Sequence, residues 1–214
     1  MIIQISSPKG GTGKTTLAVN MSVAMAYQGK NIMLVDSDRQ ISASTWWAAR
    51  QRGHADLPKV RCVQKQDEIG ATIEDLAEHY DVIVDTPGHD YADCMRAAMV
   101  KANILICPVR PSELDLNTLP EMHKIITQAR FVNPKLIAYA CINSAPTNSR
   151  DIDIAPTREI ISSYSAFKLL DTVIYDRRVY RDAMPEGLGV IEIAGKNTAR
   201  DEINALMLEV FGGA

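Results

Sequence analysis

Three glycines and two lysines lie close together near the start of the chain. Residues 8–16 read Pro-Lys-Gly-Gly-Thr-Gly-Lys-Thr-Thr, between a short apolar run at 2–6 and a segment of helical period at 14–28. Glycines let a backbone turn its N–H groups inward around an anion, and the N-terminus of the following helix adds a positive dipole. In such a loop Lys14 would bind terminal phosphates and Thr15 would offer its hydroxyl to Mg²⁺. The segment predicts a phosphate-binding loop.

Carboxylates follow two other apolar runs. Asp36 and Asp38 lie at the end of the run 31–36, and Asp85 closes the run 81–85. Ligands of open α/β sheets bind at the carboxyl ends of the strands, so we expect these carboxylates and the glycine-rich loop to meet in one crevice. Phosphoryl transfer depends mainly on positioning and charge stabilisation, which such a set of groups can supply.

The elements that would position these groups alternate regularly along the chain. Short β-branched runs alternate with longer segments of helical period, which is typical of βα units on a mostly parallel sheet. We expect an α/β fold of three layers, with helices on both faces of a twisted sheet. Pro120 is expected to disturb one helix, and Ser42 and Thr198 to mark the starts of two others. Strands are expected at 2–6, 31–36, 60–63, 81–85, 103–107, 135–142 and 168–174, and helices at 14–28, 42–53, 67–79, 91–101, 113–130, 151–164, about 177–184 and 198–211.

Length and composition favour one domain over residues 1–214, since 214 residues with 46% hydrophobic content can bury one sizeable core. A net charge of -3, from 23 basic and 26 acidic residues, excludes a globally basic protein, so any DNA-binding surface must be local. The four cysteines are widely spaced without a CxxC pair. Without a signal peptide or a long apolar segment, we expect a cytoplasmic protein with reduced thiols.

The loop departs from the standard P-loop in a specific way. The standard motif has a glycine where this chain has Pro8, and this chain adds Lys9 ahead of the glycines. The heptapeptide Lys-Gly-Gly-Thr-Gly-Lys-Thr resembles the deviant Walker A motif of the ParA/MinD family of ATPases. This resemblance implies the P-loop NTPase fold and an ATP-dependent homodimer in which Lys9 reaches the nucleotide of the other subunit. It also implies binding of ATP and Mg²⁺ through Lys9, Gly10, Gly11, Thr12, Gly13, Lys14, Thr15 and Thr16.

The carboxylate segments also resemble those of the family. Residues 35–40, Val-Asp-Ser-Asp-Arg-Gln, are similar to its D-x-D-P-Q segment, with Arg39 in place of proline. The resemblance implies that Asp38 orients or activates the attacking water and that Asp36 supports Mg²⁺ and the loop. Asp85, followed by Thr-Pro-Gly, resembles a Walker B carboxylate that reaches the metal through water. Catalysis is thereby assigned to Lys9, Lys14 and Asp38, and the metal to Thr15, Asp36 and Asp85.

Two later features resemble the family less specifically. Asn143 follows a predicted strand, where the family has an asparagine that bonds adenine; an ordinary strand-end turn is the alternative. Residues 172–193 are similar to a late segment of ParA-like partition ATPases, whose basic residues bind DNA without sequence preference. Because Asp176 and Asp182 flank the basic residues here, an ion-paired turn is the alternative. The predicted DNA-binding cluster consists of Arg177, Arg178 and Arg181.

Three functions remain open from the sequence. The preferred one is a short ParA-type ATPase that binds ATP, dimerises, associates with the nucleoid through nonspecific DNA binding, and segregates or positions DNA or cargo. Its ATP hydrolysis would be weak until a ParB-like or other partner stimulates it. A MinD-like membrane-associated ATPase would need a C-terminal amphipathic helix with a basic face, whereas residues 201–211 carry only acidic charges, so no membrane partner is expected. A metabolic P-loop kinase would need neither Lys9 nor DNA.

Overall fold

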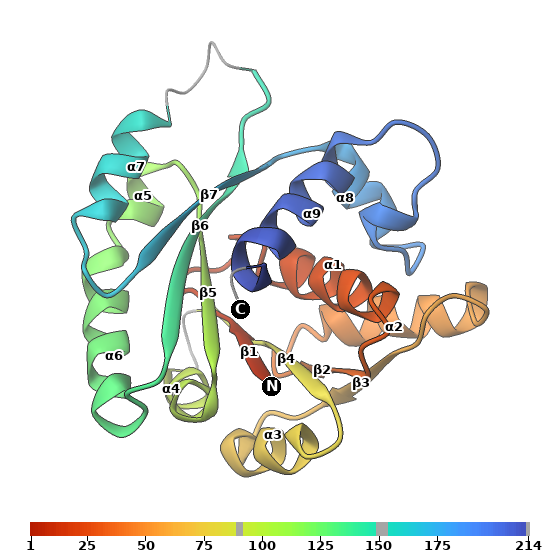
Figure 1. The fold of residues 1–214 in the computed structure, drawn as a ribbon, viewed down its shortest axis with the longest axis horizontal. Coiled ribbons are helices and arrows are strands. Elements are labelled where there is room, and N and C mark those ends of the chain that lie inside the picture. The colour runs from red at the N-terminus through yellow and green to blue at the C-terminus, as the bar shows by residue number, and fades with distance from the viewer. Residues whose placement is uncertain (89–91, 149–153, 213–214) are drawn as a thin grey trace.

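Seven parallel strands form one sheet in the computed structural model, which describes residues 1–88, 92–148 and 154–212 (Figure 1). The strand order is β3-β2-β4-β1-β5-β6-β7. The central strand β1 pairs with β4 on one side and β5 on the other, so the chain winds to both edges from the middle. The strands are β1 (Ile2–Ile5), β2 (Ile32–Asp36), β3 (Val60–Gln64), β4 (Asp81–Asp85), β5 (Ile104–Val109), β6 (Ile137–Ala145) and β7 (Lys168–Tyr175).

Helices cover both faces of the sheet, which confirms the predicted three-layer α/β fold (Figure 1). One face carries α1 (Lys14–Tyr27), α2 (Ser42–Gly53), α8 (Arg178–Ala183), the short 3-10 helix η1 (Val190–Glu192) and α9 (Thr198–Phe211). The other face carries α3 (Ile69–Ala77), α4 (Ala92–Lys101), α5 (Glu113–Leu116), α6 (Leu119–Val132) and α7 (Ala155–Ser162). In the described part of the chain, none of these helices is long and apolar enough to cross a membrane.

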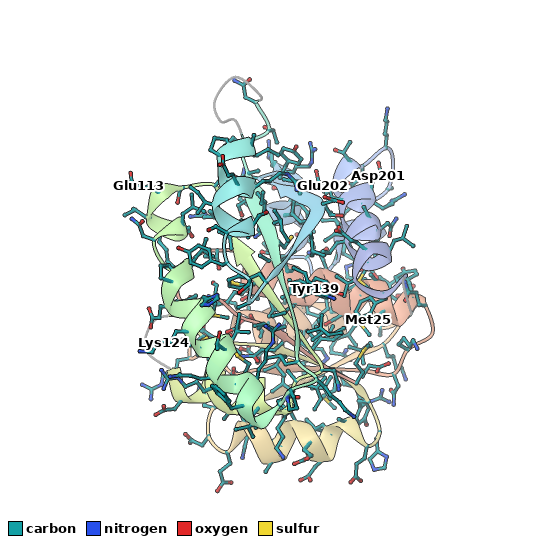
Figure 2. All side chains as sticks on the ribbon, turned by 60° about the vertical axis from the view of Figure 1, so that its left-hand side comes forward. Met25, Glu113, Lys124, Tyr139, Asp201 and Glu202 are labelled. Atoms are coloured by element: carbon teal, nitrogen blue, oxygen red, sulfur yellow. The ribbon has the colours of Figure 1, made fainter. Side chains whose placement is uncertain are left out.

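The core lies in two layers, one on each side of the sheet. Within β2, Leu34 packs on the side of α1, whereas Met33 and Val35 pack on the side of α3 and α4. Strands buried on both faces need apolar residues at successive positions, which explains their nearly continuous apolar runs. Figure 2 shows Met25 of α1 inside the molecule and Lys124 of α6 on its surface, in keeping with their burial. The sheet is therefore a rigid base for the loops at its carboxyl edge.

Several element ends differ from the sequence predictions. The predicted helix 113–130 is divided into α5 and α6, and Pro120 lies in the first turn of α6, where its missing N–H costs little. Ser42 does not cap α2, because the cap position is Ile41 with a positive φ of 51°. The cap of α9 is Asn197, whose side chain accepts a hydrogen bond from Ala199 N, and the helix begins at Thr198. Residues 91 and 151–153 of two predicted helices lie outside the described residues.

Strand β6 is longer than predicted. It continues past Asn143 to Ala145, because the neighbouring β7 pairs with it as far as Tyr175. Strand β5 likewise runs through Pro108 to Val109. Asn143 therefore lies within the last part of a paired strand rather than in the loop that follows it.

Candidate functional site

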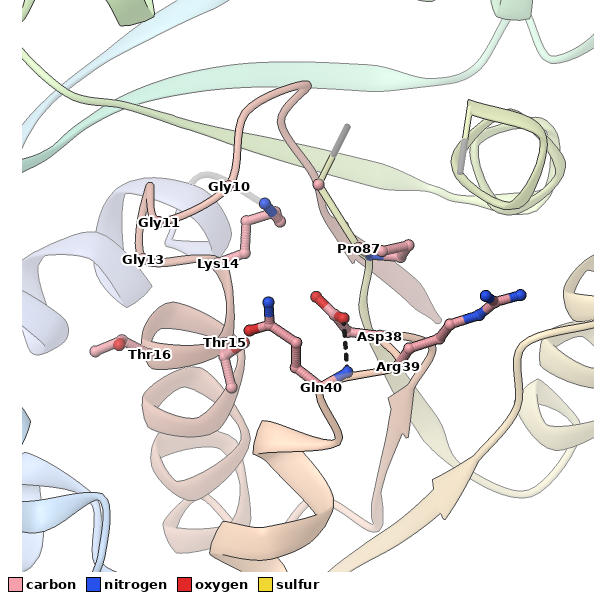
Figure 3. A pocket seen from close by; sticks show the side chains of 11 residues that line it. Gly10, Gly11, Gly13, Lys14, Thr15, Thr16, Asp38, Arg39, Gln40 and Pro87 are labelled. Atoms are coloured by element: carbon pink, nitrogen blue, oxygen red, sulfur yellow. Dashed lines mark hydrogen bonds between the residues drawn. The ribbon is translucent and has the colours of Figure 1, made fainter. Parts of the chain in front are cut away.

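A pocket of about 640 Å³ opens at the carboxyl ends of the central strands (Figure 3). Its walls come from the loop after β1, the start of α1, the loop after β2 and the segment after β4. The structure thus brings together the segments that the sequence predicts to converge. The lining residues are Gly10, Gly11, Gly13, Lys14, Thr15, Thr16, Asp38, Arg39, Gln40, Pro87 and Gly88.

Glycines shape the loop after β1. Gly11 and Gly13 have φ values of 72° and 85°, which L side chains rarely adopt. Gly13 precedes α1 and no side chain caps the helix, so the first N–H groups of α1 remain available to an anion. A Cβ atom on Gly88 would press against the backbone of Gly10, so the segment after β4 also lies closely against the loop. The result is a backbone cradle at a helix N-terminus.

The Lys14 side chain lies on the inner side of this cradle (Figure 3). It is 7% exposed, and its Nζ donates a hydrogen bond to the Lys9 carbonyl oxygen at 2.8 Å. Burial lowers the Lys14 pKa, while the carboxylates of Asp85 and Asp38 act in the opposite direction. Among the described residues the hydrogen-bond partner of Lys14 Nζ is this carbonyl oxygen, and a buried cation can exchange such a partner for a phosphate oxygen, which forms a stronger charge-assisted bond.

Thr15 and Asp85 form a second polar pair below the pocket. The Thr15 hydroxyl donates to Asp85 Oδ2 at 2.7 Å, whereas Asp85 Oδ1 is buried without a hydrogen-bond partner among the described residues. Burial raises the Asp85 pKa to about 7, against the effect of the Thr15 hydrogen bond. An unpartnered buried carboxylate oxygen beside a hydroxyl fits the hard oxygen ligands that Mg²⁺ requires, directly or through water. Thr15 and Asp85 are therefore the residues that would hold the metal.

Asp36 is placed differently from Asp85. Its Oδ2 accepts hydrogen bonds from both the N–H and the hydroxyl of Ser44 at 2.8 Å, and its Oδ1 accepts from Asp38 N at 3.2 Å. Both oxygens therefore hold the loop between β2 and α2, and the predicted support of Mg²⁺ by Asp36 stays a prediction. Ser44 was not predicted from the sequence, although a hydroxyl in the first turn of the helix after a D-x-D segment is a recognisable signal.

Asp38 belongs to the wall of the pocket opposite Lys14 (Figure 3). Its Oδ1 accepts a hydrogen bond from Gln40 N at 2.9 Å, which is a local Asx-type turn. The turn leads to Ile41, a β-branched residue held at a positive φ, which is an unfavourable conformation. The loop that carries Asp38 is therefore ordered by local hydrogen bonds, and Ser37 ties its start to the Asp85 carbonyl oxygen.

Lys9 contacts its own subunit. Its Nζ lies 2.7 Å from Asp115 Oδ2, and this carboxylate is 3% exposed. The hydroxyl of Ser112 donates to the same oxygen at 2.5 Å, and Asp115 Oδ1 is buried without a partner among the described residues. Asp115 was not predicted from the sequence, because it lies 106 residues from Lys9 and only the packing of α5 beside the loop brings them together.

Asn143 reaches the loop rather than open solvent. It is 3% exposed, and its Nδ2 donates a hydrogen bond to the Thr12 carbonyl oxygen at 2.5 Å. The Thr12 hydroxyl is occupied in a hydrogen bond with Ser7 Oγ at 2.7 Å, and Thr16 lines the pocket beside Thr15. The predicted contact of Asn143 with adenine stays a prediction.

Two arginines of the predicted DNA-binding cluster are held by carboxylates. Arg177 Nε lies 2.6 Å from Glu202 Oε1 of α9, and this arginine is partly buried. Arg181 Nη1 lies 2.6 Å from Asp176 Oδ1, in a pair that is largely exposed. The ion-paired turn that the sequence left open is thus present. Arg177 in particular serves to attach the start of α8 to α9.

The third arginine, Arg178, is the most exposed member of the cluster. Its side chain is 85% exposed and pairs with Asp182 at 3.2 Å, an interaction of the kind that contributes little at a surface. A cavity of about 570 Å³ lies between α8 and the start of α9, apart from the phosphate-binding loop. Four cations line it with one anion, Asp176; the cations are Arg177, Arg178, Arg181 and Lys196.

Comparison with protein families and curated proteins gives one consistent result. Residues 3–183 match the family model described as the CobQ/CobB/MinD/ParA nucleotide binding domain. The maintenance of carboxysome distribution protein A of Halothiobacillus neapolitanus is 30% identical over 214 residues, covering 98% of this chain and 95% of that protein. The sporulation initiation inhibitor protein Soj of Bacillus subtilis is 30% identical over 143 residues, covering 58% of this chain and 56% of that protein.

Solved structures share the fold. The apo McdA structure from Cyanthece has a TM-score of 0.79 at 16% identity, covering 98% of each chain. The septum site-determining protein MinD from Pyrococcus horikoshii, complexed with Mg-ADP, has a TM-score of 0.77 at 21% identity, covering 98% of this chain and 95% of that one. These likenesses support the predicted P-loop ATPase fold, and the family resemblance drawn from the loop sequence is confirmed.

Proposed function

The chain belongs to the family of CobQ, CobB, MinD and ParA nucleotide-binding domains, and on this basis we propose that it is a ParA-type ATPase. It binds ATP with Mg²⁺, forms a nucleotide-sandwich dimer and binds DNA nonspecifically. A partner protein then stimulates hydrolysis of ATP to ADP and phosphate, and this cycle positions DNA or another cargo.

One observation carries the proposal: Lys14, the Thr15–Asp85 pair and Asp38 surround a single cradle of backbone N–H groups. The N-terminus of α1 and Lys14 would bind the terminal phosphates. When bound, Mg²⁺ would neutralise charge on those phosphates. Asp38, in the opposite wall, would hold the attacking water in line with the terminal phosphate.

Two features of the structure support the proposal that the isolated subunit hydrolyses ATP slowly. Asp38 lies in a locally ordered loop that ends at the unfavourable conformation of Ile41. Lys9 is bound to Asp115 and cannot reach another subunit's nucleotide at the same time. A partner that fixes the loop and favours the dimer would complete the site and accelerate turnover.

The cavity beside Arg178 and Lys196 is the proposed contact for DNA phosphates. Its lining gathers four cations although the whole chain is acidic, and the arginines among them become available to phosphates when their ion pairs open. The exposed pair of Arg178 with Asp182 can open at small cost, because surface ion pairs contribute only about 0–1 kcal/mol. Dimerisation would double this surface and increase the affinity for DNA.

The cargo is the least constrained part of the proposal. The Halothiobacillus relative is named for maintaining the distribution of carboxysomes, whereas Soj is named for inhibiting the initiation of sporulation. The similarity to the Halothiobacillus protein extends over nearly the whole chain, which favours the positioning of an intracellular body over plasmid partition. The activating partner would then belong to that cargo, and a ParB-like protein would be expected if the cargo is DNA.

The helix α9 bears on the MinD-like alternative. It buries Ile203, Leu206 and Met207 against the rest of the fold, so these apolar side chains are not available to a bilayer. Flotation with liposomes in ATP tests this directly. If the protein floats with the liposomes only when ATP is present, the proposal of nonspecific DNA binding would be replaced by that of a MinD-like membrane-associated ATPase.

The proposed function is tested by measuring DNA binding with ATP, ADP and no nucleotide across a salt series, together with the molecular mass in each state. We expect a dimer and salt-sensitive DNA binding in the presence of ATP, and neither of them with ADP or without nucleotide. A monomer that phosphorylates a small substrate would indicate a metabolic kinase instead. A protein without ATP binding would refute the proposal as a whole.

A further inference from the structure

The geometry points to Asn143 as a positioning residue that fixes the phosphate-binding loop from strand β6. This inference rests on the proposed function, in which the loop 8–16 binds the phosphates of ATP. It assigns to Asn143 an action on the loop backbone, which is separate from any contact with the nucleotide base.

An irregularity in β6 directs the Asn143 side chain. Ile142 pairs with Val173 and Ala145 pairs with Tyr175, so three residue steps in β6 face two in β7. Ser144, within this interval, has a positive φ of 53°. An extra residue of this kind is a β-bulge, which bends a strand and changes the direction of its side chains, and bulges are frequent beside functional sites. The register also shifts between Ala140 and Ile142, so β6 is irregular on both sides of Ile142 where it passes the loop.

The Asn143 amide then bonds the loop directly. Its Nδ2 donates to the Thr12 carbonyl oxygen at 2.5 Å in a buried environment, where an unpaired carbonyl would be costly. The amide also packs against Gly13, because a Cβ atom built on that residue would overlap it. Gly13 therefore needs to be glycine both for its positive φ and for the space that Asn143 occupies.

By holding the Thr12 carbonyl, Asn143 also sets the direction of the Gly13 N–H. The peptide between Thr12 and Gly13 is planar and trans, so its carbonyl and the Gly13 N–H point in opposite directions. When Asn143 holds the Thr12 carbonyl on the β6 side, the Gly13 N–H is directed to the other side of the loop, and Gly13 lines the pocket. Asn143 thus pre-orients an amide donor for phosphate, which lowers the cost of ordering the loop on binding.

The same geometry limits a role in base recognition. Both hydrogens of Nδ2 have acceptors nearby, the Thr12 carbonyl oxygen and Ser144 Oγ, the latter at 3.4 Å. A hydrogen bond from this nitrogen to adenine would require one of these bonds to be given up. A contact with the base through Nδ2 would therefore compete with the contact with the loop.

The test compares two ligands that differ in the base. Binding of Mg-ATP and of Mg-tripolyphosphate, which has no base or ribose, is measured by calorimetry for the wild-type protein and for Asn143→Ala. We expect the affinity for both ligands to fall by about tenfold, as for the loss of one buried hydrogen bond. Loss confined to ATP, or no loss for either ligand, would overturn the inference.

A matched control separates this effect from general destabilisation. Asn133 also donates from Nδ2 to a backbone carbonyl, that of Ala102 at 2.7 Å, at the end of α6. Asn133→Ala should lower the melting temperature without changing either affinity. If Asn143→Ala does not fold, Asn143→Ser, whose side chain is shorter, is measured in the same way. A wild-type protein that binds neither ligand would refute the proposed function together with this inference.

Discussion

The ion pair of Lys9 with Asp115 predicts that Asp115→Asn strengthens ATP-dependent dimerisation. In the proposed dimer each Lys9 must leave its own Asp115 in order to reach the partner's nucleotide. The substitution keeps the shape of the side chain and replaces an ion pair by a hydrogen bond from the lysine to an uncharged oxygen. Each subunit then gives up a weaker interaction when the dimer forms, and no buried carboxylate loses its cation.

The magnitude follows from the geometry of the pair. Its atoms are 2.7 Å apart, Asp115 is 3% exposed, and Lys9 is 26% exposed. Hydrogen bonds to charged groups contribute about 1.5–3 kcal/mol, and we place the bond of Lys9 to a neutral amide at the lower end of this range and the ion pair at the upper end. The substitution should therefore lower the free-energy cost of releasing Lys9 on dimerisation by about 1 kcal/mol per subunit, after allowance for solvent at Lys9. Two subunits give about 2 kcal/mol, or roughly a 30-fold tighter dimer.

Sedimentation equilibrium with a non-hydrolysable ATP analogue measures this dimerisation constant. The matched control is Glu74→Gln, since Glu74 pairs with Lys101 at 2.7 Å on the α3–α4 surface, far along the chain from the loop. That variant should leave the constant unchanged. A dimer of unchanged or lower stability in Asp115→Asn, with normal ATP affinity, would show that the pair does not oppose dimerisation.

Other substitutions test the remaining parts of the site. Lys14→Ala should weaken ATP binding at least 100-fold by calorimetry, because a buried cation beside the cradle is lost; near-normal affinity would refute its role. Asp38→Ala should retain ATP binding and the dimer while turnover falls at least tenfold in a phosphate-release assay, and undiminished turnover would exclude Asp38 from catalysis. Asp85→Asn should melt several degrees higher than the wild type without ligand at pH 8, because folding buries the charged carboxylate and raises its pKa to about 7. Asp85 is protonated in the folded state below that pH, so the difference should shrink between pH 8 and pH 5; a constant difference would contradict the raised pKa. Arg178→Glu combined with Lys196→Glu should reduce DNA affinity at least tenfold and leave ATP affinity intact, and unchanged DNA binding would place the DNA contact elsewhere.

Local patterns were sufficient to predict much of the fold and the position of the loop. The β-branched runs and helical periods predicted the strands and helices to within a few residues, because each pattern reports the burial of its own segment. The glycine-rich turn, where Gly11 and Gly13 have positive φ, and the lysine at the start of α1 were predicted equally well, since they reflect backbone requirements that act within a few residues. The starts of α2 at Ser42 and of α9 at Thr198 were predicted correctly, but their cap positions lie one residue earlier, because cap identity depends on backbone angles that neighbouring contacts select.

The sequence by itself determined where phosphate chemistry is possible, through residue types at fixed spacing in the segment 8–16. Only the tertiary structure decided which partner each side chain meets there. Lys9 contacts Asp115, which lies 106 residues away in the sequence. Asn143 contacts Thr12, which lies 131 residues away, from a bulge in β6 that the local sequence did not predict. The raised pKa of Asp85 likewise requires its complete burial. The physical reason is that burial and hydrogen-bond partners depend on how distant strands and helices pack, whereas the sequence patterns report only the preferences of each segment.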